Sequence, residues 1–331
     1  MLAFWIALLA FLPATISAPV TGSTKSAECT NPVVRREWRT LSQGQRDKFH
    51  KAIKCLQDKP STFDVEESKN LFDDFGYVHY TINRTIHHVA SFFPWYVVYM
   101  HHVQRLTNVA RHRYFIILRE QALSECGYSD PMPYWDWTLD STIEHFQNSE
   151  MFDNEKGFGG NGTGKTDWVD GSCVEDGPYA GLQVNYPEPH CLTRRFNFTG
   201  SPVGNWTKSV LNEIMQYPDY INFWNNTERM PHDNLHRTIG GDMRRQYSPN
   251  EPLFFLHHAQ VDRLWTIWQG RNETRLRDYG GNTVQEVTVD TASLRDTLFT
   301  LGYAPERDVK EFMDTKSNGL CYTVSSIVVA L

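Results

Sequence analysis

The sequence predicts a mainly α-helical fold with few short strands and one long irregular region. Apolar residues recur at helical intervals; Phe49, Ile53 and Leu56, for example, follow one another at spacings of four and three. By contrast, residues 153–205 are rich in Gly, Asn, Pro and Thr, a composition that favours loops. The helices that we expect span residues 44–56, 72–86, 114–123, 203–217 and 252–269, and one more begins at residues 232–236.

The predicted helices have recognisable starts or faces. Ser42 is a residue type that caps helices, so the first helix should begin just after it. The second helix carries Phe75, His79 and Ile82 at intervals of four and three, which places the three side chains on one face. The last helix follows Pro252 and is apolar along most of its length, so we expect it to lie in the core.

The composition is that of a globular, exported protein. The chain has 331 residues, 40% of them hydrophobic and 13% aromatic, which is enough for a sizeable core. A net charge of -7 and a pI near 6.0 argue against a nucleic-acid partner. Residues 1–18 are typical of a secretory signal peptide, and their apolar run from Leu2 to Leu12 is too short to span a membrane. We therefore expect one secreted domain over residues 19–331, with its core at about 29–268 and no membrane span.

Cysteines and glycosylation sequons indicate the same compartment. Six cysteines favour three disulfides in an oxidising environment, although they allow 15 pairings. Our working hypothesis pairs Cys55 with Cys126, Cys173 with Cys191, and Cys29 with Cys321. Sequons for N-glycosylation occur at Asn83, Asn161, Asn197, Asn205, Asn225 and Asn272.

Histidines near the end of the chain point to a metal site. His232 and His236 are four residues apart, so in a helix both imidazoles can face one spot. His258 could add a third imidazole, and Asp262, one turn further on, could hold that ring by a hydrogen bond. Three neutral imidazoles suit a transition metal and leave positions open for a substrate. The alternatives are structural histidines in an aromatic core, or a zinc peptidase, which would need Glu where this chain has Asp233.

The segment Pro252-x-Phe254-Phe255-x-x-His258-x-x-x-Asp262 resembles the second copper signature of tyrosinases, catechol oxidases and molluscan haemocyanins. One departure is visible, because that signature usually opens with Asp and this chain has Glu251. The resemblance implies an upstream half-site that contributes three more histidines.

The upstream half-site is interrupted in this sequence. His79 and His87 have the family's spacing, and Phe92-Phe-Pro-Trp95 follows on schedule, but Tyr96 stands where His is expected. The expected His-Arg-Tyr-Phe occurs later, beginning at His112. Excision of residues 96–111 would restore the signature.

We interpret residues 96–111 as a translated intron, with a genuine insertion as the alternative. The codons of Trp95, Tyr96 and Val97 can contain GTAYGT, a common fungal donor sequence, and an AGG codon for Arg111 would supply the acceptor AG. The excised length is a multiple of three, so the reading frame survives. In the undeleted chain we expect the extra segment to carry His112 away from His87 and to weaken the first copper site. His101 and His102, which lie within the segment, could compete as ligands.

The resemblance implies an antiparallel four-helix bundle around a type 3 dicopper centre, with long disulfide-pinned loops. The implied ligands of the two copper ions are His79, His87 and His112 for one, and His232, His236 and His258 for the other. The implied partners are dioxygen and a small phenolic substrate. The implied reaction oxidises o-diphenols to o-quinones, with hydroxylation of monophenols or aminophenols as a further option.

Two acidic residues are candidates for the proton chemistry of a phenol. Glu228 lies four residues before His232, near the place where the family keeps a water-holding Glu. Asp233 occupies a position where tyrosinases often have Asn, and it could hold a water, act as base or cap a helix. The alternatives to an enzyme are a haemocyanin-like dioxygen-binding protein and the inactive product of a mis-spliced gene.

Overall fold

The computed structural model describes residues 29–94, 112–168, 170–200, 203–287, 289, 291–298 and 300–325. The signal-peptide prediction for residues 1–18 and the intron prediction for residues 96–111 lie outside these ranges. The helices are α1 (Gln43–Cys55), α2 (Leu71–Ile82), α3 (His112–Glu125), α4 (Ile143–Gln147), α5 (Lys208–Ile214), α6 (Tyr220–Thr227), α7 (Asp233–Ile239) and α8 (Leu253–Gly270). None of the helices in these ranges is long and apolar enough to cross a membrane.

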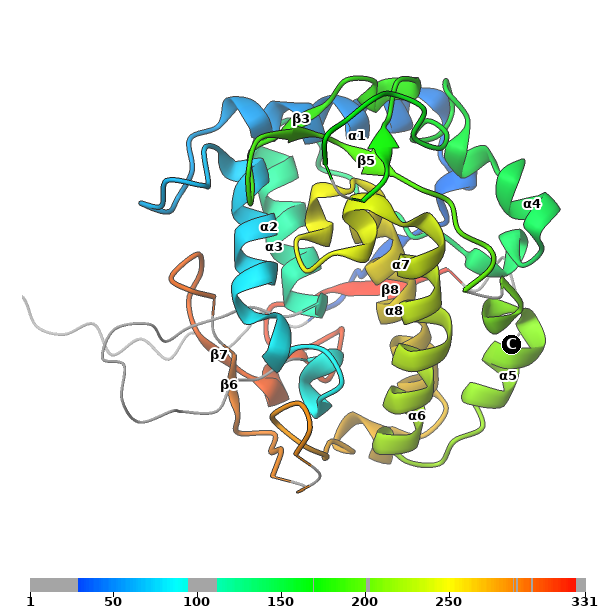
Figure 1. Ribbon diagram of the computed structural model, residues 1–331. Helices are drawn as coiled ribbons and strands as arrows, with labels where there is room; N and C mark the ends of the chain where they lie inside the picture. Colours follow the sequence, from blue (N-terminus) through cyan, green and yellow to red (C-terminus); the bar gives the residue numbers. More distant parts are fainter. Residues whose placement is uncertain are drawn as a thin grey trace, which may run out of the picture.

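Four helices form the bundle that the resemblance implied. The pairs α2 with α3 and α7 with α8 lie on opposite sides of the centre of the molecule (Figure 1). The predicted helices at 44–56, 114–123 and 252–269 are confirmed within a few residues as α1, α3 and α8. The mainly helical prediction is therefore correct.

Two boundaries differ from the prediction. The second helix ends at Ile82 and continues only as a short 3-10 turn, Asn83–Thr85, because the next residues bend the chain. We expected a helix to open at His232, but the helical chain starts twelve residues earlier at α6. It passes through a π-helical turn, Glu228–His232, into α7. The π turn contains Pro231, a residue that interrupts regular helical bonding and hides the pattern from a helical-period search.

The strands are short and lie at the edges of the helical body. β1 (Val33–Arg35) pairs in parallel with β8 (Tyr322–Val324), so the two ends of the described chain lie together. The other pairs are antiparallel: β2 (Ser172–Cys173) with β5 (Thr193–Arg194), β3 (Gln183–Val184) with β4 (His190–Cys191), and β6 (Thr297–Leu298) with β7 (Arg307–Asp308).

All three disulfides of the working hypothesis are present. Cys29–Cys321 joins the chain ends next to β1 and β8, and Cys55–Cys126 connects the ends of α1 and α3. Cys173–Cys191 lies in the irregular region between residues 153 and 205, where it links β2 to β4. Because this region has little regular structure of its own, the cross-link restricts the loops that pack over the bundle.

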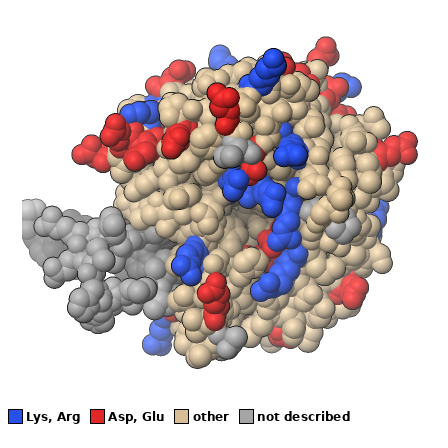
Figure 2. Space-filling view, viewed as in Figure 1, with Lys and Arg blue, Asp and Glu red and all other residues tan. Residues whose placement is uncertain are grey.

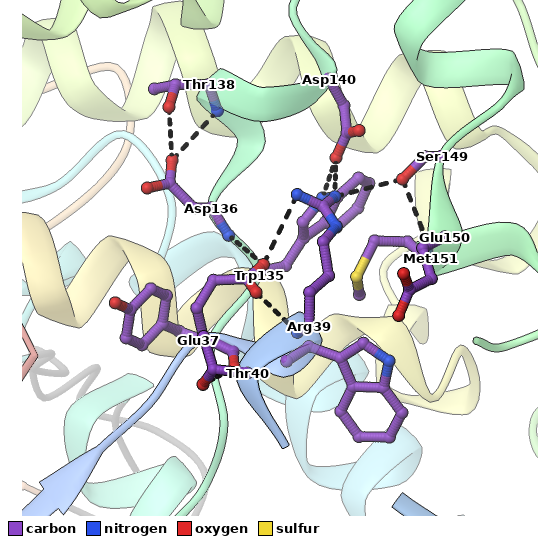
Figure 3. A network of polar contacts seen from close by, with 12 residues as sticks. Glu37, Arg39, Thr40, Trp135, Asp136, Thr138, Asp140, Ser149, Glu150 and Met151 are labelled. Atoms are coloured by element: carbon purple, nitrogen blue, oxygen red, sulfur yellow. Dashed lines mark hydrogen bonds and ion pairs between the residues drawn. The ribbon is translucent and has the colours of Figure 1, made fainter. Parts of the chain in front are cut away.

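A turn that contains Tyr134, Trp135 and Trp137 and a buried polar network support the outer side of α8. The Trp135 backbone N–H donates to the Leu256 carbonyl of α8 at 3.1 Å. Around this turn, Figure 3 shows Glu37 and Arg39 from the first strand region meeting Asp136 and Asp140. Burial raises the pKa of Glu37 to about 7, even though Arg39 opposes the shift.

Asp262 on α8 does not hold a histidine, contrary to our expectation. Its carboxylate accepts hydrogen bonds from Arg35 at 2.8 Å, from Arg113 and from the Tyr322 hydroxyl at 2.7 Å. These donors come from β1, α3 and β8, and the cluster is fully buried. The aspartate therefore ties three elements to α8, and a carboxylate with three such donors has no reason to turn toward His258.

Glu251, the departure from the copper signature, has a partner that explains its extra methylene. It forms two hydrogen bonds with the guanidinium of Arg194, at 2.8 and 2.9 Å, and both side chains are fully buried. Its Oε1 also accepts from the backbone N–H of Leu253 at 3.2 Å, at the start of α8. Glu251 thus fixes the first turn of α8 to β5 of the irregular region.

Candidate metal centre

Two groups of histidines face each other between the bundle helices. The potential ligand atoms of His79, His87 and His112 lie within 4.8 Å of one another. The same limit holds for a second group of four, His232, His236, His257 and His258. The groups adjoin, since the ring centroids of His87 and His232 are 5.7 Å apart and those of His112 and His258 are 4.0 Å apart.

In the upstream group the histidines come from α2, a bend and α3. His79 lies on α2 and donates from Nδ1 to the Gln246 carbonyl at 2.6 Å. His112 is the first described residue of α3, and its Nδ1 donates to the Phe92 carbonyl at 2.8 Å. His87 follows the 3-10 turn, and its Nδ1 lies 3.4 Å from the main-chain carbonyl oxygen of Asn83 and 3.1 Å from the side-chain amide nitrogen.

In the downstream group the histidines come from the last residue of the π turn, from α7 and from α8. His236 donates from Nδ1 to the Met243 carbonyl, and His232 donates from Nδ1 to the Asp233 carboxylate at 3.0 Å. His257 and His258 are adjacent on α8, and both are fully buried. Within the described ranges, the Nε2 atoms of His232 and His236 have no hydrogen-bond partner.

These hydrogen bonds fix the chemistry of the rings. Since carbonyl and carboxylate oxygens only accept, the Nδ1 of His79, His112, His232 and His236 carries the proton. Each Nε2 then presents a lone pair, which is the form that binds a metal. Burial, followed by the neighbouring imidazoles, lowers the pKa of nearly all these rings well below the ordinary value. Burial also lowers the pKa of His236, to about 4, although its hydrogen bond to the Met243 carbonyl and the charge of Asp233 oppose the shift. The rings are therefore neutral at physiological pH and fit copper, which prefers such nitrogen donors.

The doublet at 257–258 offers two candidates for one position. The His258 ring lies 4.0 Å from His112 and 5.0 Å from His232, so it faces both groups. The His257 ring packs against Trp137 at 5.0 Å and contacts the rings of His232 and His236 in the downstream group. Of the two, His258 is therefore the residue that would hold a metal in the downstream group.

A pocket of about 240 Å³ opens onto the histidines. Asp233 and His88 line it, and their side chains approach to 3.7 Å. Glu228 lies behind His88 and is fully buried; it accepts from the His88 backbone N–H and from the Trp224 indole, both at 2.7 Å. Burial, followed by repulsion from Asp233, raises the pKa of Glu228 well above its ordinary value.

All six histidines predicted as ligands thus lie in one place. The expected displacement of His112 by the extra segment is wrong, because the His87 and His112 ring centroids are only 5.5 Å apart. The competing ligands proposed at residues 101 and 102 lie outside the described residues. His88 and His257, each next to a predicted ligand in the sequence, also lie at the site, and the two His-His doublets were the signal that could have found them.

The bundle and its facing histidine groups define a dinuclear metalloprotein of the kind built between antiparallel helices. Residues 69–271 match the common central domain of tyrosinase. The chain is 37% identical to tyrosinase ustQ of Aspergillus flavus, over 92% of this chain and 82% of that protein. It is 34% identical to tyrosinase-like protein phomQ1 of Diaporthe leptostromiformis, over 93% of this chain and 81% of that protein.

Among solved structures, a polyphenol oxidase from Thermothelomyces thermophila superposes with a TM-score of 0.72, at 27% identity and 89% coverage of both chains. The chain belongs to the tyrosinase family. It is a copper oxidoreductase of the polyphenol oxidase type, and its cofactor is a type 3 dicopper centre.

Proposed function

We propose that this protein oxidises o-diphenols to o-quinones with dioxygen, and that it is secreted. The observation that carries the proposal is the pair of facing imidazole groups beneath an open pocket. In this proposal His79, His87 and His112 hold one copper, and His232, His236 and His258 hold the other. The two coppers supply the binding and reduction of dioxygen. Hydroxylation of monophenols or aminophenols is the further activity that such a site can support.

The chain's own residues handle the substrate and its protons. Asp233 lines the pocket and also accepts from His232, so it is the carboxylate placed to take a proton from an entering phenol. Glu228 acts indirectly. It accepts a hydrogen bond from the His88 backbone N–H and so holds the bend that carries His87. We therefore assign Asp233 the role of base and Glu228 the role of a positioning residue. A comparison of the pH dependence of monophenol oxidation in Asp233→Asn and in Glu228→Gln would separate these roles. Only the loss of a base should change that dependence.

The decisive experiment measures 4-methylcatechol oxidation by the copper-loaded protein, with oxygen uptake recorded beside quinone formation. His236→Ala serves as the control that lacks one proposed ligand. Turnover by the parent protein and none by the variant is the expected result. A protein that binds two coppers and dioxygen reversibly but does not turn over the catechol would instead support the haemocyanin-like alternative. Failure to bind copper would support the inactive product of a mis-spliced gene.

A further inference from the structure

Arginines surround the mouth of the pocket. Arg237, Arg244 and Arg245 line the pocket above the histidines. Arg229 lines an adjoining pocket of about 440 Å³ that shares His88 with the first. Figure 2 shows basic side chains gathered around a hollow on the face where Figure 1 places α7. The chain is acidic overall, with a net charge of -7, so this concentration of positive charge is local.

Two of these arginines have carboxylate partners and two do not. Arg237 pairs with Asp233 at 3.3 Å, and Arg245 pairs with Asp170. Among the described residues, Arg244 has no ion-pair partner, and the guanidinium of Arg229 donates to the side-chain amide oxygen of Asn225, at 3.4 Å, and has no ion-pair partner. Both side chains belong to exposed residues. The mouth therefore keeps two positive charges that no neighbouring acidic group within the described ranges neutralises by direct pairing, although exposed Glu286 also lines the adjoining pocket.

The geometry relates these charges to a substrate. A phenol that approaches the histidines with its hydroxyl group points its opposite end outward, toward the mouth. A substituent at that end comes near Arg244, which lines this pocket, and the adjoining pocket, which Arg229 lines. Guanidinium groups bind carboxylates through paired hydrogen bonds, and at a pocket mouth they also attract anions over a distance.

We propose that this arginine rim makes the site selective for phenols that carry a carboxylate on the substituent opposite the reacting hydroxyl. The inference rests on the proposed phenol oxidation and specifies its substrate class. Because the carboxylate lies away from the reacting carbon and oxygen, the rim binds the ground state and the transition state equally. It should therefore lower KM and leave kcat nearly unchanged.

The test compares 3,4-dihydroxyphenylacetate with 4-methylcatechol, a pair that differs in the charge of the outer substituent. In the parent protein we expect kcat/KM to be higher for the anion by roughly five- to tenfold at low salt, the size of one to two exposed charge interactions. Added NaCl should raise KM for the anion and leave KM for the neutral catechol unchanged, since salt screens exposed charges.

Arg244→Gln is the informative variant, and Arg295→Gln is its matched control. Arg295 is also exposed but lines neither pocket, so its loss changes net charge by the same amount. Arg244→Gln should raise KM for the anion roughly fivefold without a comparable change for 4-methylcatechol. Equal KM values for the two catechols in the parent protein, or equal effects of the two substitutions, would overturn the proposal.

A binding measurement separates this inference from the proposed function. Under argon, calorimetry of the copper-loaded protein with 4-hydroxyphenylacetate and with 4-methylphenol reports affinity without turnover. If no catechol is oxidised but the anion still binds more tightly and loses that advantage in Arg244→Gln, the proposed function fails and the rim assignment stands. If catechols are oxidised while both phenols bind alike, the rim assignment fails alone.

Discussion

The two histidine groups of this protein are held in different ways. The downstream histidines lie on two helices, and His232, His236 and His258 are all buried. The upstream group draws on three separate pieces of chain, and His87 is half-buried in a bend beyond α2. A helix sets its side chains at fixed intervals, so the spacing of the downstream histidines already pointed to a metal site. A bend has no such period, so the upstream group needed the family's signature.

The supports around the two groups differ as well. Around α8 they are buried ionic contacts, notably Glu251 with Arg194 and the three donors on Asp262. The upstream rings of His79 and His112 are oriented by the main-chain carbonyls of Gln246 and Phe92, as the ring of His236 downstream is by that of Met243. Gln246 lies between α7 and α8, so the downstream half also orients His79. We therefore expect changes to the loop between α7 and α8 to affect both metals, whereas removal of a single ligand should affect only the copper that this ligand would hold.

The sharpest test of the downstream half concerns the histidine doublet. The proposed site holds two coppers per chain, and His258→Ala should remove about one of them and abolish catechol oxidation. The reason is that the His258 ring faces both groups. His257→Ala should keep both coppers, since that ring packs on Trp137. Elemental analysis of the purified variants measures the metal. Retention of copper by His258→Ala with loss in His257→Ala would reverse the assignment.

Glu251 tests how far the ionic support of α8 matters. Glu251→Gln leaves the buried charge of Arg194 without its carboxylate, which should lower the free energy of unfolding by roughly 3–5 kcal/mol. Urea unfolding of the metal-free protein provides the measurement. Lys310→Gln is the control; it breaks an exposed pair with Asp308 and should cost less than about 1 kcal/mol. Similar costs for the two substitutions would mean that the buried pair is not a principal support.

The limits of sequence reasoning follow from the same contrast. The helices of the bundle, the presence of three disulfides and the six clustered histidines were predictable, because they depend on periodicity, cysteine count and a signature; the disulfide pairing was a hypothesis that the count alone did not select. The role of Asp262 was not, since its partners Arg35 and Tyr322 come from opposite ends of the chain. The arginine rim also escaped prediction, because its side chains meet only when the π turn, α7 and the loop after it fold together around the pocket.

The support behind α8 also predicts a pH dependence. The pKa of Glu37 is about 7 in the folded protein and ordinary in the unfolded chain, so the folded state holds the proton more tightly. Stability from this group is therefore present below pH 4.5 and is lost as pH rises to 7, by up to about 3 kcal/mol. Urea unfolding at pH 5 and pH 8 should show this loss in the parent and in Glu155→Gln, an exposed control, but not in Glu37→Gln. An unchanged difference in Glu37→Gln would assign the effect to another group.

On the upstream side, Asn83 is the nearest support of His87. Asn83→Ala removes the side-chain contact with His87 at 3.1 Å. It should weaken the affinity of the upstream group for copper roughly tenfold, as measured by chelator competition. Asn83 is also a sequon, so Thr85→Val is the matched control, since it removes the sequon and keeps the asparagine. Equal weakening in both variants would point to a glycan and not to the side chain.

The smallest effect should come from removing the extra segment, residues 96–111. We propose that this segment is a translated intron, and we expect sequencing of mature transcripts to find a message without its codons. The structure changes what the deletion should do. His112 donates to the Phe92 carbonyl at 2.8 Å, so described residues on the two sides of the interruption lie together.

Joining Trp95 to His112 should therefore leave the histidine groups in place. The deleted protein should bind two coppers, oxidise catechols like the undeleted protein, and unfold within about 1 kcal/mol of it, since loop length alone changes stability slowly. Elemental analysis, oxygen uptake and urea unfolding of the two chains measure these three quantities. A second copper or an activity that appears only after deletion would show that the segment disturbs the upstream half in solution. A mature message that retains these codons would make the segment a genuine insertion.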